Sequence, residues 1–98
     1  MGVAASLTYF LVEWYRPAIT DEPFDTSVAR LIECAESMSA PESPVRLRAT
    51  FATSADEVVL AVFDSVSEEA VAEVCRRAGC PAQRLTAHVD ARFWPPET

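Results

Sequence analysis

The single histidine of the chain, His88, is the side chain best suited to proton transfer or metal binding near neutral pH. It stands in a stretch, residues 84–92, in which apolar and polar residues alternate. In a strand with that alternation, the His88 side chain leaves the same face as those of Thr86 and Asp90. The chemistry open to His88 therefore depends on which residues the neighbouring strands place on that face.

Four residues of suitable chemistry can meet on such a face, and we predict that Tyr9, Glu13, Arg48 and His88 form a ligand site. A phenol, an acid, a guanidinium and an imidazole around an apolar groove suit a small anionic aromatic or lactone-like molecule. The same residues support a second hypothesis, a cofactor-free isomerase or monooxygenase in which His88 is the acid or base and Glu13 orients it. The competing interpretation is a structural hydrogen bond between Glu13 and His88, since polar groups on a buried face need partners.

The three cysteines follow no metal or disulfide pattern. Cys75 and Cys80 are separated by four residues and followed by one histidine, which matches no common zinc spacing. An odd number of cysteines also argues against a disulfide framework and suits a reducing compartment. We predict that Cys75 fills the core, that Cys80 is the more exposed thiol, and that neither is catalytic.

Four stretches of the chain have the composition of strands. The first is dense in aromatic and β-branched residues, and the third is apolar on both of its faces, as a central strand should be. The second alternates, which places Val45 and Phe51 on one face and Arg46 and Arg48 on the other. In chain order the four stretches are residues 7–16, 45–53, 57–64 and 84–92.

Two stretches between these strands have a helical pattern. After Pro23, apolar residues recur at intervals of three and four, which predicts a helix that ends before the loop 39–44. The second helix is expected to be capped by Ser65 or Ser67 and to end at Gly79, whose backbone can adopt the left-handed conformation.

This order of elements predicts an α+β fold, the ferredoxin-like βαββαβ plait, with a four-stranded antiparallel sheet. Both helical crossovers must be right-handed, so both helices lie on one face of the sheet. The chain has 98 residues, which suits a single domain. We expect its core to span about residues 7–92, followed by a short tail, 93–98.

Helices on one face leave the other face of the sheet uncovered and, for either orientation of the strand 7–16, apolar. A large exposed apolar patch marks an interface or a ligand groove. We therefore predict a homodimer packed sheet to sheet, a dimeric α/β barrel, with Leu11, Trp14 and Tyr15 as interface residues. The alternatives are a ligand cleft or a tail that lies over this face.

Several short segments resemble a bacterial family of small ferredoxin-like domains, a domain of unknown function that is labelled nickel-binding. The clearest of them runs from Arg77-Ala78-Gly79-Cys80-Pro81 to Thr86, and the others are residues 9–13, 55–59, 62–64 and 69–71. The resemblance implies the same fold, a dimer, and a site for a metal or a small ligand. If a divalent transition metal such as nickel is bound, His88 is the ligand that this sequence offers.

The charge of the chain excludes two classes of partner. It has 15 acidic and 8 basic residues, a net charge of −7, whereas nucleic acids and anionic membranes select basic surfaces. No stretch approaches 18 apolar residues and the N-terminus lacks a secretory pattern, so we expect a cytoplasmic protein. Our first hypothesis is a non-enzymatic dimer that binds a small ligand or a metal, and the isomerase or monooxygenase is the alternative.

Overall fold

The computed structural model describes residues 7–15, 24–53 and 58–95. All six predicted elements are present, although the last strand ends at Val89 and not at Arg92. Pro23, where we expected the first helix to begin, lies outside the described residues. In chain order the elements are β1 (Thr8–Tyr15), α1 (Phe24–Met38), β2 (Val45–Thr53), β3 (Val58–Ser65), α2 (Glu68–Arg77) and β4 (Arg84–Val89).

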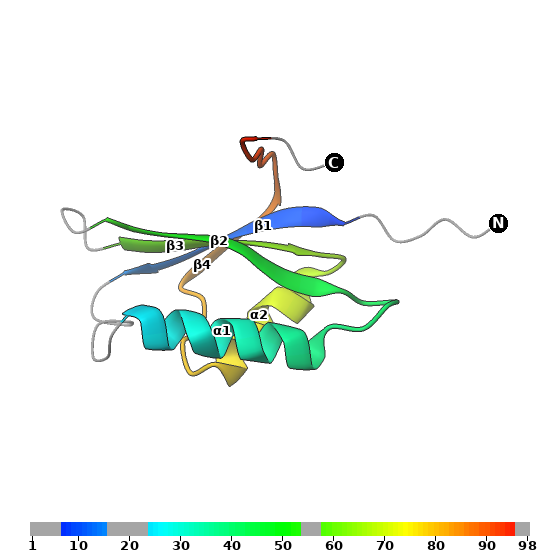
Figure 1. Cartoon of the computed structure of the whole chain (residues 1–98), viewed down its shortest axis with the longest axis horizontal. Coiled ribbons are helices and arrows are strands. Elements are labelled where there is room, and N and C mark those ends of the chain that lie inside the picture. Colours follow the sequence, from blue (N-terminus) through cyan, green and yellow to red (C-terminus); the bar gives the residue numbers. More distant parts are fainter. Residues whose placement is uncertain (1–6, 16–23, 54–57, 96–98) are drawn as a thin grey trace.

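The four strands form one antiparallel sheet in the order β2-β3-β1-β4. Both helices pack against the same face of this sheet, the lower face in Figure 1. This arrangement is the ferredoxin-like plait, and the predicted fold is confirmed. Of the described helices, neither is long and apolar enough to cross a membrane.

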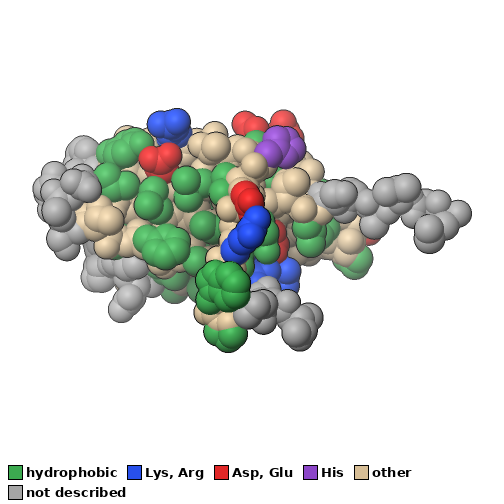
Figure 2. Space-filling model, turned by 90° about the horizontal axis from the view of Figure 1, so that it is seen from above, with side chains coloured by type: hydrophobic (Ala, Val, Ile, Leu, Met, Phe, Trp, Pro, Cys, Tyr) green, Lys and Arg blue, Asp and Glu red, His purple; other side chains and the backbone are tan. Residues whose placement is uncertain are grey.

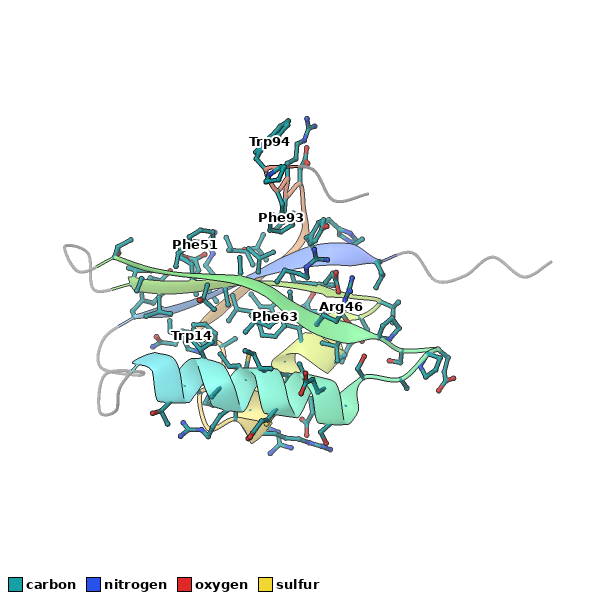
Figure 3. The ribbon with its side chains drawn as sticks, in the orientation of Figure 1. Trp14, Arg46, Phe51, Phe63, Phe93 and Trp94 are labelled. Atoms are coloured by element: carbon teal, nitrogen blue, oxygen red, sulfur yellow. The ribbon has the colours of Figure 1, made fainter. Side chains whose placement is uncertain are left out.

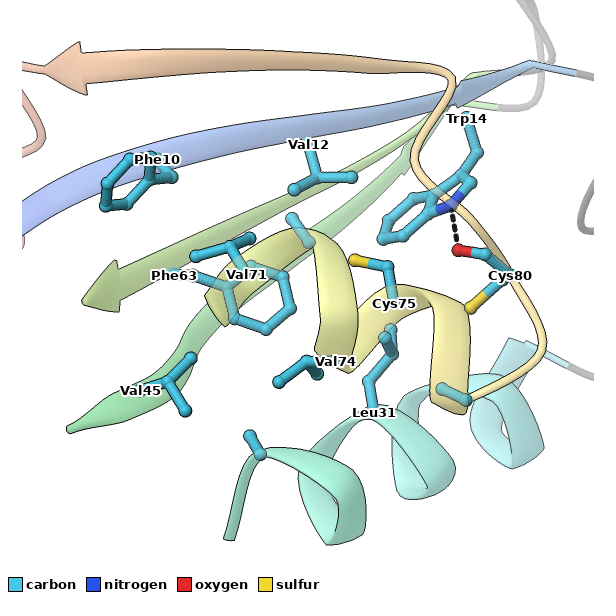
Figure 4. Close-up of a cluster of buried hydrophobic side chains, with 13 residues drawn as sticks. Phe10, Val12, Trp14, Leu31, Val45, Phe63, Val71, Val74, Cys75 and Cys80 are labelled. Carbon is cyan, nitrogen blue, oxygen red and sulfur yellow. Dashed lines mark hydrogen bonds between the residues drawn. The ribbon is translucent and has the colours of Figure 1, made fainter. Parts of the chain in front are cut away.

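Alternate residues of β1 face the helices. Phe10, Val12 and Trp14 are buried, and the residues between them point to the other side of the sheet. Trp14 is fully enclosed, and its indole Nε1 donates a hydrogen bond of 2.8 Å to the carbonyl oxygen of Cys80 (Figure 4). The prediction that Trp14 belongs to a dimer interface is therefore corrected: it is a core residue, because its position in β1 turns it towards the helices.

Local signals define both ends of α2. Ser67 is its N-cap and accepts a hydrogen bond of 3.1 Å from the backbone N–H of Ala70, as one of the two predicted caps. Gly79 ends the helix with a positive φ of 86°, a conformation that glycine adopts without steric cost. The chain then turns back on the helix, and the N–H of Cys80 donates to the carbonyl oxygen of Cys75.

This turn buries both cysteines near the end of α2. Cys75 is in the core as predicted, and burial raises the pKa of its thiol to about 12. Cys80 is buried as well, so the prediction of an exposed thiol is wrong. The reason is the return of the chain under the helix, which places Cys80 against Trp14.

The other helix, α1, covers the β2 side of the sheet. Leu31 and Ala35 are buried, whereas Ile32 is 40% exposed at the margin of the helix. A groove of about 360 Å³ runs between α1 and β2, and Ile32, Val45 and Leu47 are among its lining residues. It lies on the helical side of the sheet, away from most of the predicted site residues.

An exposed ion-pair cluster on α2 should make stability depend on pH. Arg76 and then Arg77 hold the pKa of the Glu73 carboxyl at about 2, below its usual value of 4.5, through side-chain hydrogen bonds that include two of 2.8 Å. A carboxyl whose pKa is lowered on folding stabilises the fold fully above pH 4.5 and loses that contribution as the pH falls towards 2. We expect Glu73→Gln to show a smaller loss of urea stability between pH 5 and pH 2 than the wild type. Glu69→Gln, at an exposed position on the same helix, is the matched control, and an equal effect of both variants would contradict the prediction.

Candidate functional site

The side of the sheet opposite the helices, which we call the outer face, is not covered by either helix (Figure 1). In Figure 2, which looks down on this side, hydrophobic side chains spread over much of the surface and charged ones gather at several points. From the strand register, the outer face is formed by Tyr9, Leu11, Glu13, Tyr15, Arg46, Ala49, Phe51, Thr53, Val58, Leu60, Val62, Asp64, Arg84, Thr86 and Val89. The Arg48 side chain joins this face through its contact with Asp64. Leu11 and Tyr15, predicted at a dimer interface, both lie on it.

A bulge in β2 changes which residues of that strand belong to the outer face. The register shifts between Leu47 and Ala49, so that Arg48 is the extra residue. Beyond the bulge, Phe51 pairs with Leu60 on the outer face and is 52% exposed. The predicted alternation, which placed Phe51 on the same side as Val45, is therefore wrong beyond Leu47. The outer face gains a large aromatic side chain as a result.

Two arginines meet one buried carboxylate at one end of the outer face. Arg46 contacts Asp64 with two hydrogen bonds of 3.2 and 2.9 Å, and Arg48 adds a third of 2.8 Å. The Asp64 side chain is only 4% exposed and that of Arg48 is 13% exposed. Buried charges of this kind need such partners, so the cluster fixes the position of the Arg48 guanidinium.

Sequence reasoning missed Asp64 as a member of this site. The signal was present, because Asp64 directly follows six apolar residues of a strand that should be buried. A buried acid in such a strand must find a cationic partner. The strand that supplies the partners carries the two arginines of the alternating stretch, Arg46 and Arg48.

The segment that follows β4 crosses the outer face near this cluster. The Phe93 ring meets Tyr9 edge-on, with 5.6 Å between ring centroids, and lies 5.2 Å from the guanidinium carbon of Arg48. Figure 3 shows Phe93 above the sheet and Trp94 farther out. One of our alternatives was a tail that lies over this face. Phe93 confirms this alternative for one end of the face. It also brings together two predicted ligand residues, Tyr9 and Arg48.

Glu13 has partners other than the one we expected. It accepts a hydrogen bond of 2.7 Å from the Tyr15 hydroxyl, and its carboxylate lies 3.6 Å from Nε of Arg84 on the neighbouring strand. The hydrogen bond to the Glu13 carboxylate raises the pKa of the Tyr15 hydroxyl. In the part of the chain that the structure describes, no hydrogen bond joins Glu13 to His88, so the predicted pair is not assembled.

His88 lies at a bulge on the edge strand β4. The pairing of β1 with β4 shifts between Tyr9 and Leu11, and His88 has a positive φ of 58°. Its side chain is exposed, as the single purple group at the margin of the surface in Figure 2. The structure thus separates His88 from Glu13, which pairs with Arg84 farther along the same strand.

The backbone conformation of His88 gives a direct test of the bulge. A left-handed conformation costs a residue with a Cβ about 1–2 kcal/mol, a cost that glycine avoids. We expect His88→Gly to be about 1 kcal/mol more stable than His88→Ala, which corresponds to roughly 4–8 °C in melting temperature for a domain of this size. Calorimetry of the two variants tests this, and an alanine variant as stable as the glycine variant would show that the bulge is not retained.

The described residues do not fit the nickel site that the family resemblance implied. Among residues 7–15, 24–53 and 58–95, no group of three or more His, Cys, Asp or Glu side chains could hold a metal ion. Two of the three cysteines are buried in the core, and His88 is exposed on the edge strand β4. His88 therefore remains a predicted metal ligand for which the described residues supply no ligand set.

Comparison with known proteins supports the fold. No protein-family model matches the chain, and no curated protein matches it significantly. Among solved structures, the crystal structure of SCO4226 from Streptomyces coelicolor A3(2) is similar, with a TM-score of 0.68 and 19% identity. The match covers 88% of this chain and all of that one. At this identity the likeness shows a shared ferredoxin-like α+β fold with a bacterial protein, and the family resemblance stays a prediction.

Proposed function

We propose that this chain forms a homodimer through its outer face. Between the two sheets it binds a small anion that carries an aromatic ring, without catalysis. The observation that carries the proposal is the outer face itself. It is apolar over most of its area, the helices leave it uncovered, and Arg48 is fixed at one end of it. On a single protomer such a surface marks an interface or a binding site.

The charge distribution favours a second copy of the chain as the partner. The charged residues of the outer face are Glu13, Asp64, Arg46, Arg48 and Arg84, three arginines against two acids. The whole chain has a net charge of −7, so two copies repel each other over most of their surfaces. The outer face has a net charge of +1, so contact through this face brings two copies together with less repulsion than contact through their acidic surfaces.

The dimensions of the sheet are also sufficient. Eight-residue strands are about 26 Å long and four strands about 19 Å wide, which gives a face of about 500 Å² per protomer. Two such faces reach about 1,000 Å², the lower bound for a specific interface. Sheets that pack face to face are about 10 Å apart, and the Phe93 ring, whose centroid is 5.6 Å from that of Tyr9, would lie within that gap.

The ligand class follows from the side chains at the end of the outer face that Phe93 covers. Arg48 attracts an anion, and Tyr9 with the apolar strand residues favours a ring. The paired carboxylate and imidazole needed for proton transfer are apart, since Glu13 contacts Tyr15 and Arg84. This arrangement supports binding in preference to the isomerase or monooxygenase alternative.

Native mass spectrometry and light scattering of the wild-type protein test the dimer, and calorimetry with naphthalene-2-carboxylate tests the site. We expect a dimer that binds this carboxylate more tightly than the uncharged naphthalene-2-carboxamide. A monomer at micromolar concentration would overturn the dimer, and equal affinity for the two probes would overturn the anion site. Incubation with nickel in the same mass measurement tests the metal prediction, and a retained ion would favour metal binding.

A further inference from the structure

The Phe93 ring lies against two residues of the proposed ligand site, Arg48 and Tyr9. The ring lies 5.2 Å from the guanidinium carbon of Arg48 and meets Tyr9 at 64° with a centroid distance of 5.6 Å. Contact with a guanidinium and an edge-on contact with a second ring are two of the interactions by which proteins hold aromatic groups. The chain therefore presents one of its own rings to the two residues of the proposed site.

The segment that carries Phe93 is held more loosely than the strand before it. Residues 90–95 follow β4 without strand pairing, and no backbone hydrogen bond between described residues ties them to the sheet. The ion pair of Asp90 with Arg92 is local and exposed. Trp94, the next residue, is 80% exposed and stands away from the sheet (Figure 3). The contacts of the Phe93 ring with Tyr9 and Arg48 thus help to hold this segment on the outer face.

We infer that Phe93 is an intramolecular occupant of the aromatic subsite over Arg48 and Tyr9, so that an aromatic anion binds there by displacing the C-terminal segment. This inference rests on the proposed ligand site and adds its regulation. A ligand that must displace Phe93 binds with an apparent affinity equal to its intrinsic affinity multiplied by the fraction of molecules in which the ring has left the site. The guanidinium beside the ring, that of Arg48, is held by Asp64 and stays in position when the ring leaves.

Two substitutions of Phe93 move this equilibrium in opposite directions. Phe93→Ala removes the competing ring, whereas Phe93→Trp offers a ring that holds a guanidinium more strongly. Both change a half-exposed residue outside the sheet, so neither should impair folding. The probe is naphthalene-2-carboxylate, titrated into the wild type and both variants, with naphthalene-2-carboxamide as the uncharged control.

A second readout follows the segment itself. The protein has two indole groups: that of Trp14 is buried and hydrogen-bonded to Cys80, and that of Trp94 is exposed next to Phe93. In a proton–nitrogen correlation spectrum, displacement of the segment changes the Trp94 indole signal. The Trp14 indole signal is the internal control, since the core does not change.

We expect Phe93→Ala to bind the carboxylate about fivefold more tightly than the wild type, and Phe93→Trp to bind it more weakly. In the wild type the Trp94 signal should shift as the probe saturates the site, and the Trp14 signal should not. Equal affinities with a silent Trp94 would overturn the inference and leave the proposed site intact. Weaker binding to Phe93→Ala would also overturn it, because Phe93 would then be part of the binding wall. Absence of binding by all three proteins would overturn both the proposed ligand site and this inference.

Discussion

Replacing Trp14 with alanine should lower the free energy of unfolding by about 3–5 kcal/mol, the range for removal of a large aromatic side chain from a core. Trp14 is among the largest fully buried side chains, between β1 and α2 (Figure 4). Its loss opens a cavity and also leaves the carbonyl oxygen of Cys80 without the indole donor. Domains of this size are stable by only about 5–15 kcal/mol, so the variant should be close to the limit of folding.

Two further variants separate the packing of Trp14 from its hydrogen bond. Trp14→Phe keeps most of the volume and loses the bond to Cys80, so we expect a smaller loss than for alanine. Trp94→Ala is the matched control, because this indole is exposed and should contribute less than about 0.5 kcal/mol. Urea denaturation followed by far-ultraviolet circular dichroism measures all three. A loss of under 1 kcal/mol for Trp14→Ala would contradict the placement of Trp14 in the core.

The parts of this fold that local chemistry decides were predictable from sequence. The cap at Ser67 and the left-handed Gly79 are set by neighbours within a few residues; Ser67 is one of the two caps that the sequence offered, and Gly79 is where the sequence placed it. The order of elements follows from the periodicity of apolar residues, and the plait then follows from the handedness of its crossovers. These inferences hold because each depends on a short stretch of chain.

The two bulges were not predictable in the same way. A bulge inserts one residue against the partner strand, and the alternation of residue types within one strand does not reveal it. In β2 the bulge moves Phe51 to the outer face, and in β4 it separates His88 from the regular alternation. Both lie on edge strands, where bulges are frequent. The bulges are therefore the reason that the candidate site differs from the predicted one at Phe51 and His88.

Contacts between distant segments account for the other differences. Asp64 binds two arginines that precede it by 18 and 16 residues, and which acid they would meet depends on the register of β2 against β3. Phe93 reaches Arg48 from the end of the chain. The sequence suggested a tail over the face only as an alternative, since 93–98 has no pattern that ties it to a strand. Long-range pairing therefore determines the site more than local preference does.

The proposed dimer makes a second strong prediction, that Phe51→Glu dissociates it. In a two-fold interface each substitution places two carboxylates between the sheets. Burial of an unpaired charge costs several kcal/mol, so two of them should raise the dissociation constant of the dimer by about 1,000-fold or more. Phe51 is 52% exposed on the protomer, and the substitution should leave the stability of the separate chain within about 0.5 kcal/mol. Light scattering across a concentration series measures the shift from dimer to monomer.

The control for this prediction is Ile32→Glu, which introduces the same charge at another exposed apolar residue. Ile32 is 40% exposed and lies on α1, on the helical side of the sheet. Charge repulsion over the whole molecule rises equally in both variants, because each changes the net charge from −7 to −8. Only Phe51→Glu places that charge on the outer face, and so only this variant should become a monomer. If Ile32→Glu dissociates the dimer and Phe51→Glu does not, the two chains meet through the groove between α1 and β2. In that case the outer face is open to the ligand from solvent.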